Sequence, residues 1–123
     1  MRVLLVEDNE MDLMLIRRQL KKYIEDLELM NVASVKGLKN LLQESWDVII
    51  SDAHLPDGEL PDIAQAVADS GNEAPFIICS GSLYLINPEE LAKTPHIIVE
   101  KGSWADLMNA LIALGASIKS LDN

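Results

Sequence analysis

Short apolar runs constrain the fold of this chain more than any other feature of its sequence. Each run is too short for a helix and contains Val or Ile, a pattern typical of parallel strands buried on both faces of a sheet. A weaker, alternating run between Leu27 and Ser34 predicts a further strand nearer the edge of that sheet. The four strong runs are VLLV from Val3, DVIIS from Asp47, FIICS from Phe76 and HIIVE from His96.

Helical patterns separate the apolar runs. Asn9 and Ser34 stand where N-cap residues are expected, directly before stretches with apolar residues at helical spacing, and Gly71 follows the end of a third stretch. Apolar spacing and capping signals together predict five helices: after Asn9 to about Lys22, after Ser34 through Leu42, from Leu60 to Ser70, from Asn87 to before Pro95, and from Ser103 to about Ile118.

The order of these elements predicts an α/β fold. Strand and helix alternate with short connections, which is typical of a parallel sheet with right-handed crossovers and helices on both faces. The length of 123 residues and the hydrophobic content of 49% suit one domain, so we expect a single domain over residues 1–123. In open sheets of this kind, ligands bind at the carboxyl ends of the strands. Functional residues are therefore expected where the strands end.

Charge and cysteine content exclude several classes of function. The formal net charge of -10 argues against nucleic acid as a direct partner, because duplex binding depends largely on Lys and Arg that neutralise phosphates. The single cysteine, Cys79, excludes an internal disulfide and a cysteine-based zinc site. No apolar run is long enough to span a bilayer, and Met1 leads straight into a strand. We therefore expect a cytoplasmic protein without a membrane partner.

Polar or charged residues stand at the ends of four predicted strands. They are Glu7 and Asp8 after the first strong run, Asp52 after the second, Ser80 at the end of the third and Lys101 after the fourth. Strand ends lie near the surface, where polar residues are ordinary, and this explanation suffices for any one of them. The set as a whole makes chemical sense, and it is therefore a candidate site.

The chemistry of this set points to a metal ion and a phosphoryl group. Three carboxylates at one edge repel one another, so at neutral pH they need a compensating cation or must shift their protonation. Oxygen ligands without His or Cys suit Mg²⁺, so we expect Asp8 and Asp52 to bind Mg²⁺, with Glu7 acting through water. Lys101 offers an ammonium and Ser80 a hydroxyl. A carboxylate beside a divalent cation and an ammonium is suited to attack phosphorus, which makes Asp52 a candidate nucleophile.

These motifs together resemble the receiver domain of two-component response regulators, the family of chemotaxis-regulator-like receivers. The resemblance rests on LLVEDN with Glu7 and Asp8, IISDAHLPDG with Asp52, IICSG with Ser80 and VEKG with Lys101, and it covers essentially the whole chain. It implies a flavodoxin-like, doubly wound sheet of five parallel strands in the order 2-1-3-4-5 with five flanking helices. Such a domain either stands alone or has been cut from a longer protein.

The resemblance also implies a function. A receiver takes a phosphoryl group from a histidine kinase or phosphotransfer protein in a Mg²⁺-dependent reaction, and then changes its contacts with a downstream protein or an adjoining output module. It catalyses only its own phosphorylation and dephosphorylation, so we expect no enzyme for an external substrate. The implied roles are phosphoacceptor for Asp52, switch hydroxyl for Ser80, ion-pairing lysine for Lys101, and Mg²⁺ ligands for Asp8, Asp52, Glu7 through water and the backbone carbonyl of His54.

Three features depart from the usual receiver pattern. Ile98 stands where an aromatic residue is usual, Gly102 follows Lys101 where a proline is usual, and the fourth helix is short. These departures fall on the face formed by the fourth helix, fifth strand and fifth helix, which commonly carries the output of a receiver. An alternative function therefore stays open, namely a degenerate receiver that binds protein independently of phosphorylation.

Two other interpretations fit the residues less well. A phosphatase with an aspartyl nucleophile of the haloacid-dehalogenase type needs a second Asp two residues after the first, and that position is His54. Metal-binding imidazoles would have to come from His54 and His96, which are isolated from each other beside different strand ends. An oxygen-ligand site at the carboxyl edge remains the preferred prediction.

Overall fold

Five parallel strands form the central sheet of the protein. The computed structural model describes residues 1–81, 86–87, 89 and 97–116. The sheet has the order β2-β1-β3-β6-β7, which confirms the predicted order 2-1-3-4-5 and places the weaker strand at the edge. The strands are β1 (Arg2–Val6), β2 (Glu28–Val32), β3 (Val48–Ser51), β6 (Phe76–Ser80) and β7 (Ile97–Glu100).

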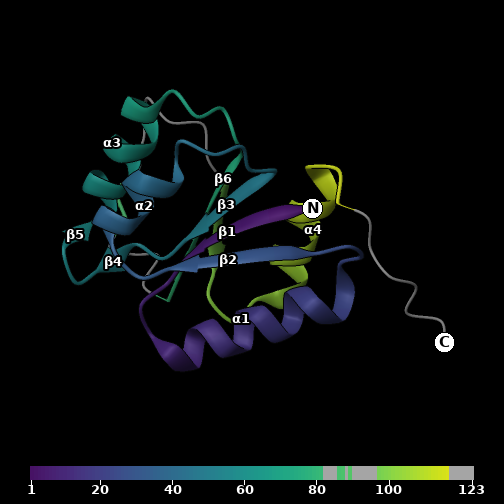
Figure 1. The fold of residues 1–123 in the computed structure, drawn as a ribbon. Helices are drawn as coiled ribbons and strands as arrows, with labels where there is room; N and C mark the ends of the chain where they lie inside the picture. Colours follow the sequence, from purple (N-terminus) through teal and green to yellow (C-terminus); the bar gives the residue numbers. More distant parts are fainter. Residues whose placement is uncertain (82–85, 88, 90–96, 117–123) are drawn as a thin grey trace, which may run out of the picture.

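Helices cover both faces of the sheet, with α1 and α4 on one face and α2 and α3 on the other (Figure 1). The fourth predicted helix, from Asn87, falls almost wholly outside the described residues. No helix in the described ranges is long and apolar enough to cross a bilayer. The helices that the structure describes are α1 (Glu10–Tyr23), α2 (Val35–Leu41), α3 (Leu60–Ser70) and α4 (Trp104–Ala113).

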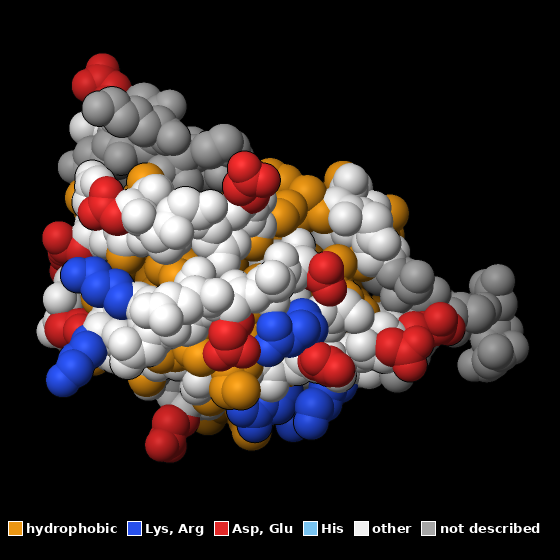
Figure 2. Space-filling model, turned by 45° about the horizontal axis from the view of Figure 1, so that its top comes forward, with side chains coloured by type: hydrophobic (Ala, Val, Ile, Leu, Met, Phe, Trp, Pro, Cys, Tyr) orange, Lys and Arg blue, Asp and Glu red, His pale blue; other side chains and the backbone are white. Residues whose placement is uncertain are grey.

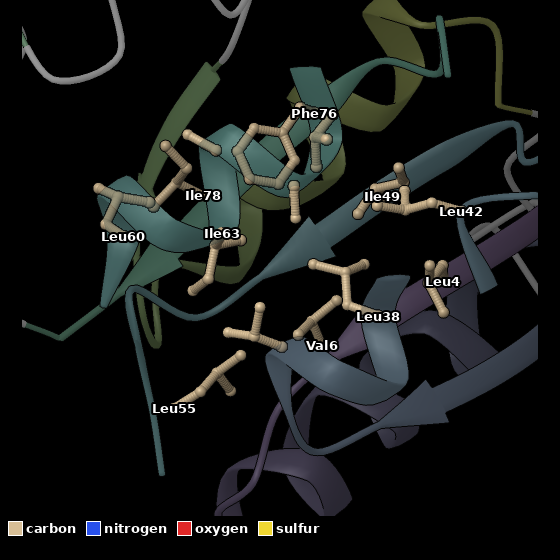
Figure 3. Packing of buried hydrophobic residues seen from close by; sticks show 14 of the residues in the cluster. Leu4, Val6, Leu38, Leu42, Ile49, Leu55, Leu60, Ile63, Phe76 and Ile78 are labelled. Atoms are coloured by element: carbon tan, nitrogen blue, oxygen red, sulfur yellow. The ribbon is translucent and has the colours of Figure 1, made fainter. Parts of the chain in front are cut away.

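The core consists of two aliphatic layers, one on each face of the sheet. Successive residues of a strand point to opposite faces, so Leu4 packs in the layer of α2 and α3, whereas Leu5 packs in the layer of α1 and α4. Figure 3 shows the first layer, to which α2 contributes Leu38 and α3 contributes Ile63. These side chains are fully buried. Their burial supplies the main stabilisation of the sheet, at about 25 cal/mol per Å² of apolar surface removed from water.

The excess of acidic residues is visible on the surface. Figure 2 shows Lys and Arg side chains in separate groups, interrupted by Asp and Glu side chains, over the face that it presents. The whole chain carries twenty acidic against ten basic residues. The charge pattern of this face therefore differs from the continuous basic patch of a nucleic-acid interface.

Side-chain caps fix where the first two helices begin. Asn9 Oδ1 accepts a hydrogen bond from the Asp12 N–H (3.0 Å) at the start of α1. Ser34 Oγ accepts a hydrogen bond from the Gly37 N–H (3.0 Å) at the start of α2. Both contacts satisfy backbone donors that a helix leaves unpaired in its first turn, and both N-cap predictions are confirmed.

The last helix ends earlier than the sequence predicts. It stops at Ala113 rather than near Ile118. Gly115 adopts a left-handed conformation (φ +94°), and its N–H donates to the Ile112 carbonyl. The next N–H, of Ala116, donates to the carbonyl of Leu111, five residues before it. This pair of bonds is a Schellman motif, with which glycine commonly terminates a helix, so the prediction of a longer helix was wrong.

A small hairpin that the sequence did not reveal follows β3 directly. Its strands, β4 (His54–Leu55) and β5 (Gly58–Glu59), pair antiparallel. Asp57, in the turn between them, accepts hydrogen bonds from the backbone N–H groups of Val35 (2.7 Å) and Lys36 (3.1 Å) at the start of α2. These bonds hold the pKa of Asp57 below its usual range. The hairpin is thereby fixed to the first turn of α2.

Gly58 permits the close approach of this hairpin to α2. A Cβ atom at this position would lie 2.7 Å from Val35 Cγ2 and 3.1 Å from Asp62 Cβ. We expect Gly58→Ala to lower the free energy of unfolding by about 1–3 kcal/mol in urea denaturation, because packed atoms must shift.

Gly81→Ala is the matched control for this substitution. A Cβ atom at Gly81 would meet nothing within 4 Å in the described part of the chain, so we expect a change below about 0.5 kcal/mol. Equal losses of stability in the two variants would contradict the close-approach role of Gly58.

Candidate functional site

Strand register brings two of the predicted site residues, Glu7 and Asp52, together. Val6 of β1 pairs with Ser51 of β3, so the residues that follow them, Glu7 and Asp52, are neighbours at the carboxyl edge of the sheet. The Asp52 N–H donates to the Val6 carbonyl (2.9 Å) and extends this pairing by one residue. The two carboxylates therefore leave adjacent strands at the same level.

Ser80 and Lys101 reach the same edge from the neighbouring strands. β6 pairs with β3, and β7 pairs with β6. The Lys101 N–H donates to the Ser80 carbonyl (2.8 Å), and the Ser80 side chain is buried. Cys79, which precedes Ser80, is buried, and burial raises the pKa of its thiol to about 11. The cysteine therefore stays protonated near neutral pH.

The carboxylates of the three acidic residues predicted to hold Mg²⁺ lie close together. Oxygen atoms of Glu7, Asp8 and Asp52 all lie within 4.8 Å of one another, a spacing that a single cation can bridge. Glu7 is buried, Asp52 is mostly buried and Asp8 is exposed. The structure thus brings together the side chains that the sequence predicts to hold Mg²⁺.

Glu7 contributes a carboxylate from a buried position. Its Oε1 accepts a hydrogen bond from the Asn9 N–H (3.1 Å). Its Oε2 accepts no well-aligned hydrogen bond within the described residues, and it meets Lys101 Nζ as an ion pair at 2.9 Å. Burial raises the pKa of Glu7; the contact with Lys101 opposes this rise and the charge of Asp52 adds to it. A buried oxygen with spare acceptor capacity suits a metal-bound water.

Lys101 lies among three carboxylates. Its Nζ is 2.9 Å from Glu7 Oε2, 2.9 Å from Asp12 Oδ2 and 3.3 Å from Asp52 Oδ2. Burial alone acts to lower the pKa of this lysine, but its contacts with the carboxylates of Asp12 and Glu7 outweigh burial. The attraction of Asp52 adds to them, and the pKa of Lys101 is raised above its usual range. Lys101 is therefore held as a cation.

Asp12 is the site residue that the sequence prediction missed. It lies in the first turn of α1, which begins at the edge where β1 ends. Acidic residues are ordinary in a first turn because they interact favourably with the positive end of the helix dipole. The signal in the sequence was the position of Asp12 in the first turn of the helix that follows Glu7, Asp8 and the N-cap Asn9.

Asp52 is oriented between its neighbours. Its Oδ1 accepts a hydrogen bond from the Ala53 N–H (2.7 Å), and its Oδ2 faces Lys101 Nζ. The side chain keeps 12% of its surface exposed. Asp52 is thus a held carboxylate that remains partly accessible from solvent.

The imidazole of His54 is not part of the acidic cluster formed by Glu7, Asp8 and Asp52. Its Nδ1 contacts the Glu59 carboxylate across the hairpin, and the ring is about half exposed. The imidazole therefore has a partner other than a metal ion. The role of the His54 backbone carbonyl as a Mg²⁺ ligand stays a prediction, and His96 lies outside the described residues.

The donor set of the site fits Mg²⁺. The clustered side-chain donors of Glu7, Asp8 and Asp52 are all carboxylate oxygens, which Mg²⁺ prefers. With Asp12, these carboxylates outnumber the single ammonium of Lys101 among the described residues at this edge. A divalent cation would relieve their mutual repulsion.

The turn after Lys101 explains the glycine that follows it. Gly102 has a φ of +95°, a conformation that glycine adopts readily, and the Ser103 N–H closes the turn on the Glu100 carbonyl (3.0 Å). A proline ring fixes φ near about −65° and is incompatible with this conformation. The departure from the usual receiver pattern is therefore a different turn, and Lys101 still reaches the site.

Comparison with solved structures decides the fold. The receiver domain of a sensor histidine kinase from Pseudomonas aeruginosa, solved with a magnesium ion coordinated in its active site cleft, has a TM-score of 0.79 at 19% identity, covering 92% of this chain and 95% of that chain. This chain has the response-regulator receiver fold. A CheY-like receiver domain from Methylobacillus flagellatus has a TM-score of 0.74 at 20% identity, covering 92% of this chain and 97% of that chain.

A third solved structure similar to this chain contains promoter DNA. RcsB from Salmonella enterica, bound to the rprA promoter in the presence of the phosphomimetic BeF₃⁻, has a TM-score of 0.75 at 25% identity, covering 93% of this chain and 98% of that chain. No protein-family model and no curated protein matches the sequence. The likeness is therefore one of fold, and the chemistry of the candidate site has to be argued from the residues of this chain.

Mg²⁺ is expected to stabilise this domain. A ligand that binds only the folded protein raises the free energy of unfolding by about 2.7 kcal/mol at roughly a hundred times its Kd. We expect Mg²⁺ to raise the Tm in thermal unfolding followed by circular dichroism, and we expect Asp8→Ala to abolish this rise.

Asp69→Ala is the matched control for the Mg²⁺ experiment. Asp69 lies near the C-terminal end of α3, at the opposite edge of the sheet, because crossover helices run antiparallel to the strands. The control should keep the full rise in Tm. A rise that survives in Asp8→Ala, or a wild-type protein that Mg²⁺ does not stabilise, would count against a metal site at the acidic cluster.

Proposed function

We propose that the protein is a phosphoryl-accepting signalling switch in which Asp52 is the phosphoacceptor. The observation that carries the proposal is the place of Asp52, which belongs to the acidic cluster and also lies 3.3 Å from Lys101 Nζ. A carboxylate between a cation site and an ammonium matches the electrostatic requirement of phosphoryl transfer, where negative charge on the transferred group must be stabilised.

The proposed reaction transfers a phosphoryl group from a phosphorylated histidine of a kinase or phosphotransfer protein. One oxygen of Asp52 attacks phosphorus, the P–N bond of the donor breaks, and the donor imidazole leaves with the bonding electron pair. The product is an acyl phosphate on Asp52. The domain would catalyse only its own phosphorylation and the later hydrolysis of its acyl phosphate.

The remaining site residues would stabilise the phosphoryl oxygens and hold the metal. Lys101 would place its ammonium against one oxygen, and Ser80 would donate its hydroxyl hydrogen to another. Asp8 and Asp52 would bind Mg²⁺, with Glu7 through water and the His54 backbone carbonyl. Once bound, the ion supplies positive charge that polarises the phosphoryl group.

The proposal extends to partners and location. The phosphorylated domain would change its contacts with a downstream protein or an adjoining output module in the cytoplasm. Similar structures support partners of this kind: one is the receiver domain of a sensor histidine kinase, and another is RcsB solved with a phosphomimetic on promoter DNA. For this chain we propose a protein partner, because its net charge is -10.

A second candidate is a receiver fold that binds protein independently of phosphorylation. The observation that favours it is Ile98 on β7, which is 36% exposed and stands where receivers usually carry an aromatic residue. Without that aromatic ring, phosphorylation has one fewer side chain to reposition on this face. The two candidates differ in one outcome: phosphorylation changes the affinity for a protein partner or the oligomeric state in the first candidate, and it changes neither in the second.

Acetyl phosphate is the direct probe of the acceptor. Incubation of the wild-type protein with acetyl phosphate and Mg²⁺ should add the mass of one phosphoryl group, measured by intact-protein mass spectrometry. Asp52→Asn should abolish the addition, because the amide oxygen is a poor nucleophile. Asp57→Asn is the matched control, since this carboxylate lies in the same loop but faces α2, and it should be phosphorylated normally. An unmodified wild-type protein that is folded and binds Mg²⁺ would favour the second candidate.

A further inference from the structure

Asp12 contacts Lys101 but does not belong to the acidic cluster of Glu7, Asp8 and Asp52. Its Oδ2 lies 2.9 Å from Lys101 Nζ, as close as Glu7 Oε2. Glu7 and Asp52, the other carboxylates that the structure places at this ammonium, both belong to the group whose oxygens lie within 4.8 Å of one another. Asp12 is not part of that group. It is therefore the contact of Lys101 that has no second function as a candidate metal ligand.

The first turn of α1 holds Asp12 in place. The Asp12 N–H donates to Asn9 Oδ1 (3.0 Å) at the N-cap. One turn further along, Ile16 is buried in the core against the sheet. The helix start is thus fixed by its cap and by its buried face, so the carboxylate of Asp12 projects from a rigid element, as a positioning group requires.

We propose that Asp12 is a positioning residue for phosphoryl transfer. It keeps the Lys101 ammonium at the site when the carboxylates of Glu7 and Asp52 interact with a divalent cation. This inference rests on the proposed function. A carboxylate that binds a cation shares its charge with that ion, so Glu7 and Asp52 then attract Lys101 less strongly. The lysine has a flexible four-carbon stem, and its bond to Asp12 keeps the ammonium from turning toward solvent.

An opposite role for Asp12 also has a physical basis. Its negative charge repels an anionic phosphodonor, and its bond to Lys101 competes with the phosphoryl oxygens. The geometry favours positioning, because Nζ has three hydrogens to donate and lies between Asp12 and Asp52 at 2.9 and 3.3 Å. Lys101 can therefore keep its bond to Asp12 while another hydrogen points to a phosphoryl group on Asp52.

The first test is the rate constant for phosphorylation by acetyl phosphate at saturating Mg²⁺. We expect Asp12→Ala to lower it about tenfold, since misplacement of a catalytic group by about 1 Å costs up to about a hundredfold. The Kd for Mg²⁺ should change less than about fivefold, because Asp12 lies outside the acidic cluster of candidate Mg²⁺ ligands. Asp12→Glu restores a carboxylate and should recover part of the rate. Glu10→Ala is the matched control, because Glu10 is the other acidic residue in the first turn, and it should leave the rate unchanged.

The second test uses the metal-free protein and needs no phosphorylation. Asp12→Ala and Lys101→Met form a double-mutant cycle in the free energy of unfolding, and a direct ion pair makes their effects non-additive. Additive effects, or an Asp12→Ala rate equal to or above that of the wild type, overturn the proposal. A wild-type protein that takes no phosphoryl group overturns the proposed function and this inference together, whereas a normal wild-type rate with an unaffected variant overturns only the role of Asp12.

Discussion

The site depends on one interaction, the contact of the Lys101 ammonium with the carboxylates of Glu7, Asp12 and Asp52. Carboxylates gathered at one edge of a sheet repel one another, and a nearby cation is what allows them to share that space at neutral pH. The pKa of Lys101 is raised, because the attraction of the carboxylates around it outweighs the effect of its burial. The fully buried position of Glu7 is tolerable for the same reason, since an unpaired buried carboxylate would be costly.

The fold brings these charges together from segments far apart in the chain. Parallel strands end at the same edge, and the pairing of Val6 with Ser51 and of Ser80 with Glu100 sets the level at which each polar residue follows its strand. The two aliphatic layers hold that register, because a slip by one residue would turn every buried side chain to the other face. The start of α1 adds Asp12 from outside the sheet. Site geometry is therefore a consequence of core packing.

Sequence reasoning succeeded where one local signal determined the outcome. Buried β-branched runs predicted the strands, and parallel topology then placed Asp52 beside Glu7 and Lys101 beside Ser80. It failed where the outcome depended on contacts between distant segments. The contact of Asp12 with Lys101 needs the packing of α1 against the sheet, and a first-turn acid already has a local explanation. The hairpin after β3 has strands of two residues each, too short for an alternating pattern to be recognised.

The most direct test of the account is a crystal structure of the protein with Mg²⁺ and BeF₃⁻, a mimic of the phosphoryl group. We expect BeF₃⁻ on the Asp52 carboxylate, Mg²⁺ bound by Asp8 and Asp52, and Lys101 Nζ in contact with a fluorine while it keeps its bond to Asp12. A structure in which Mg²⁺ binds elsewhere, or in which BeF₃⁻ is bound away from Asp52, would contradict it.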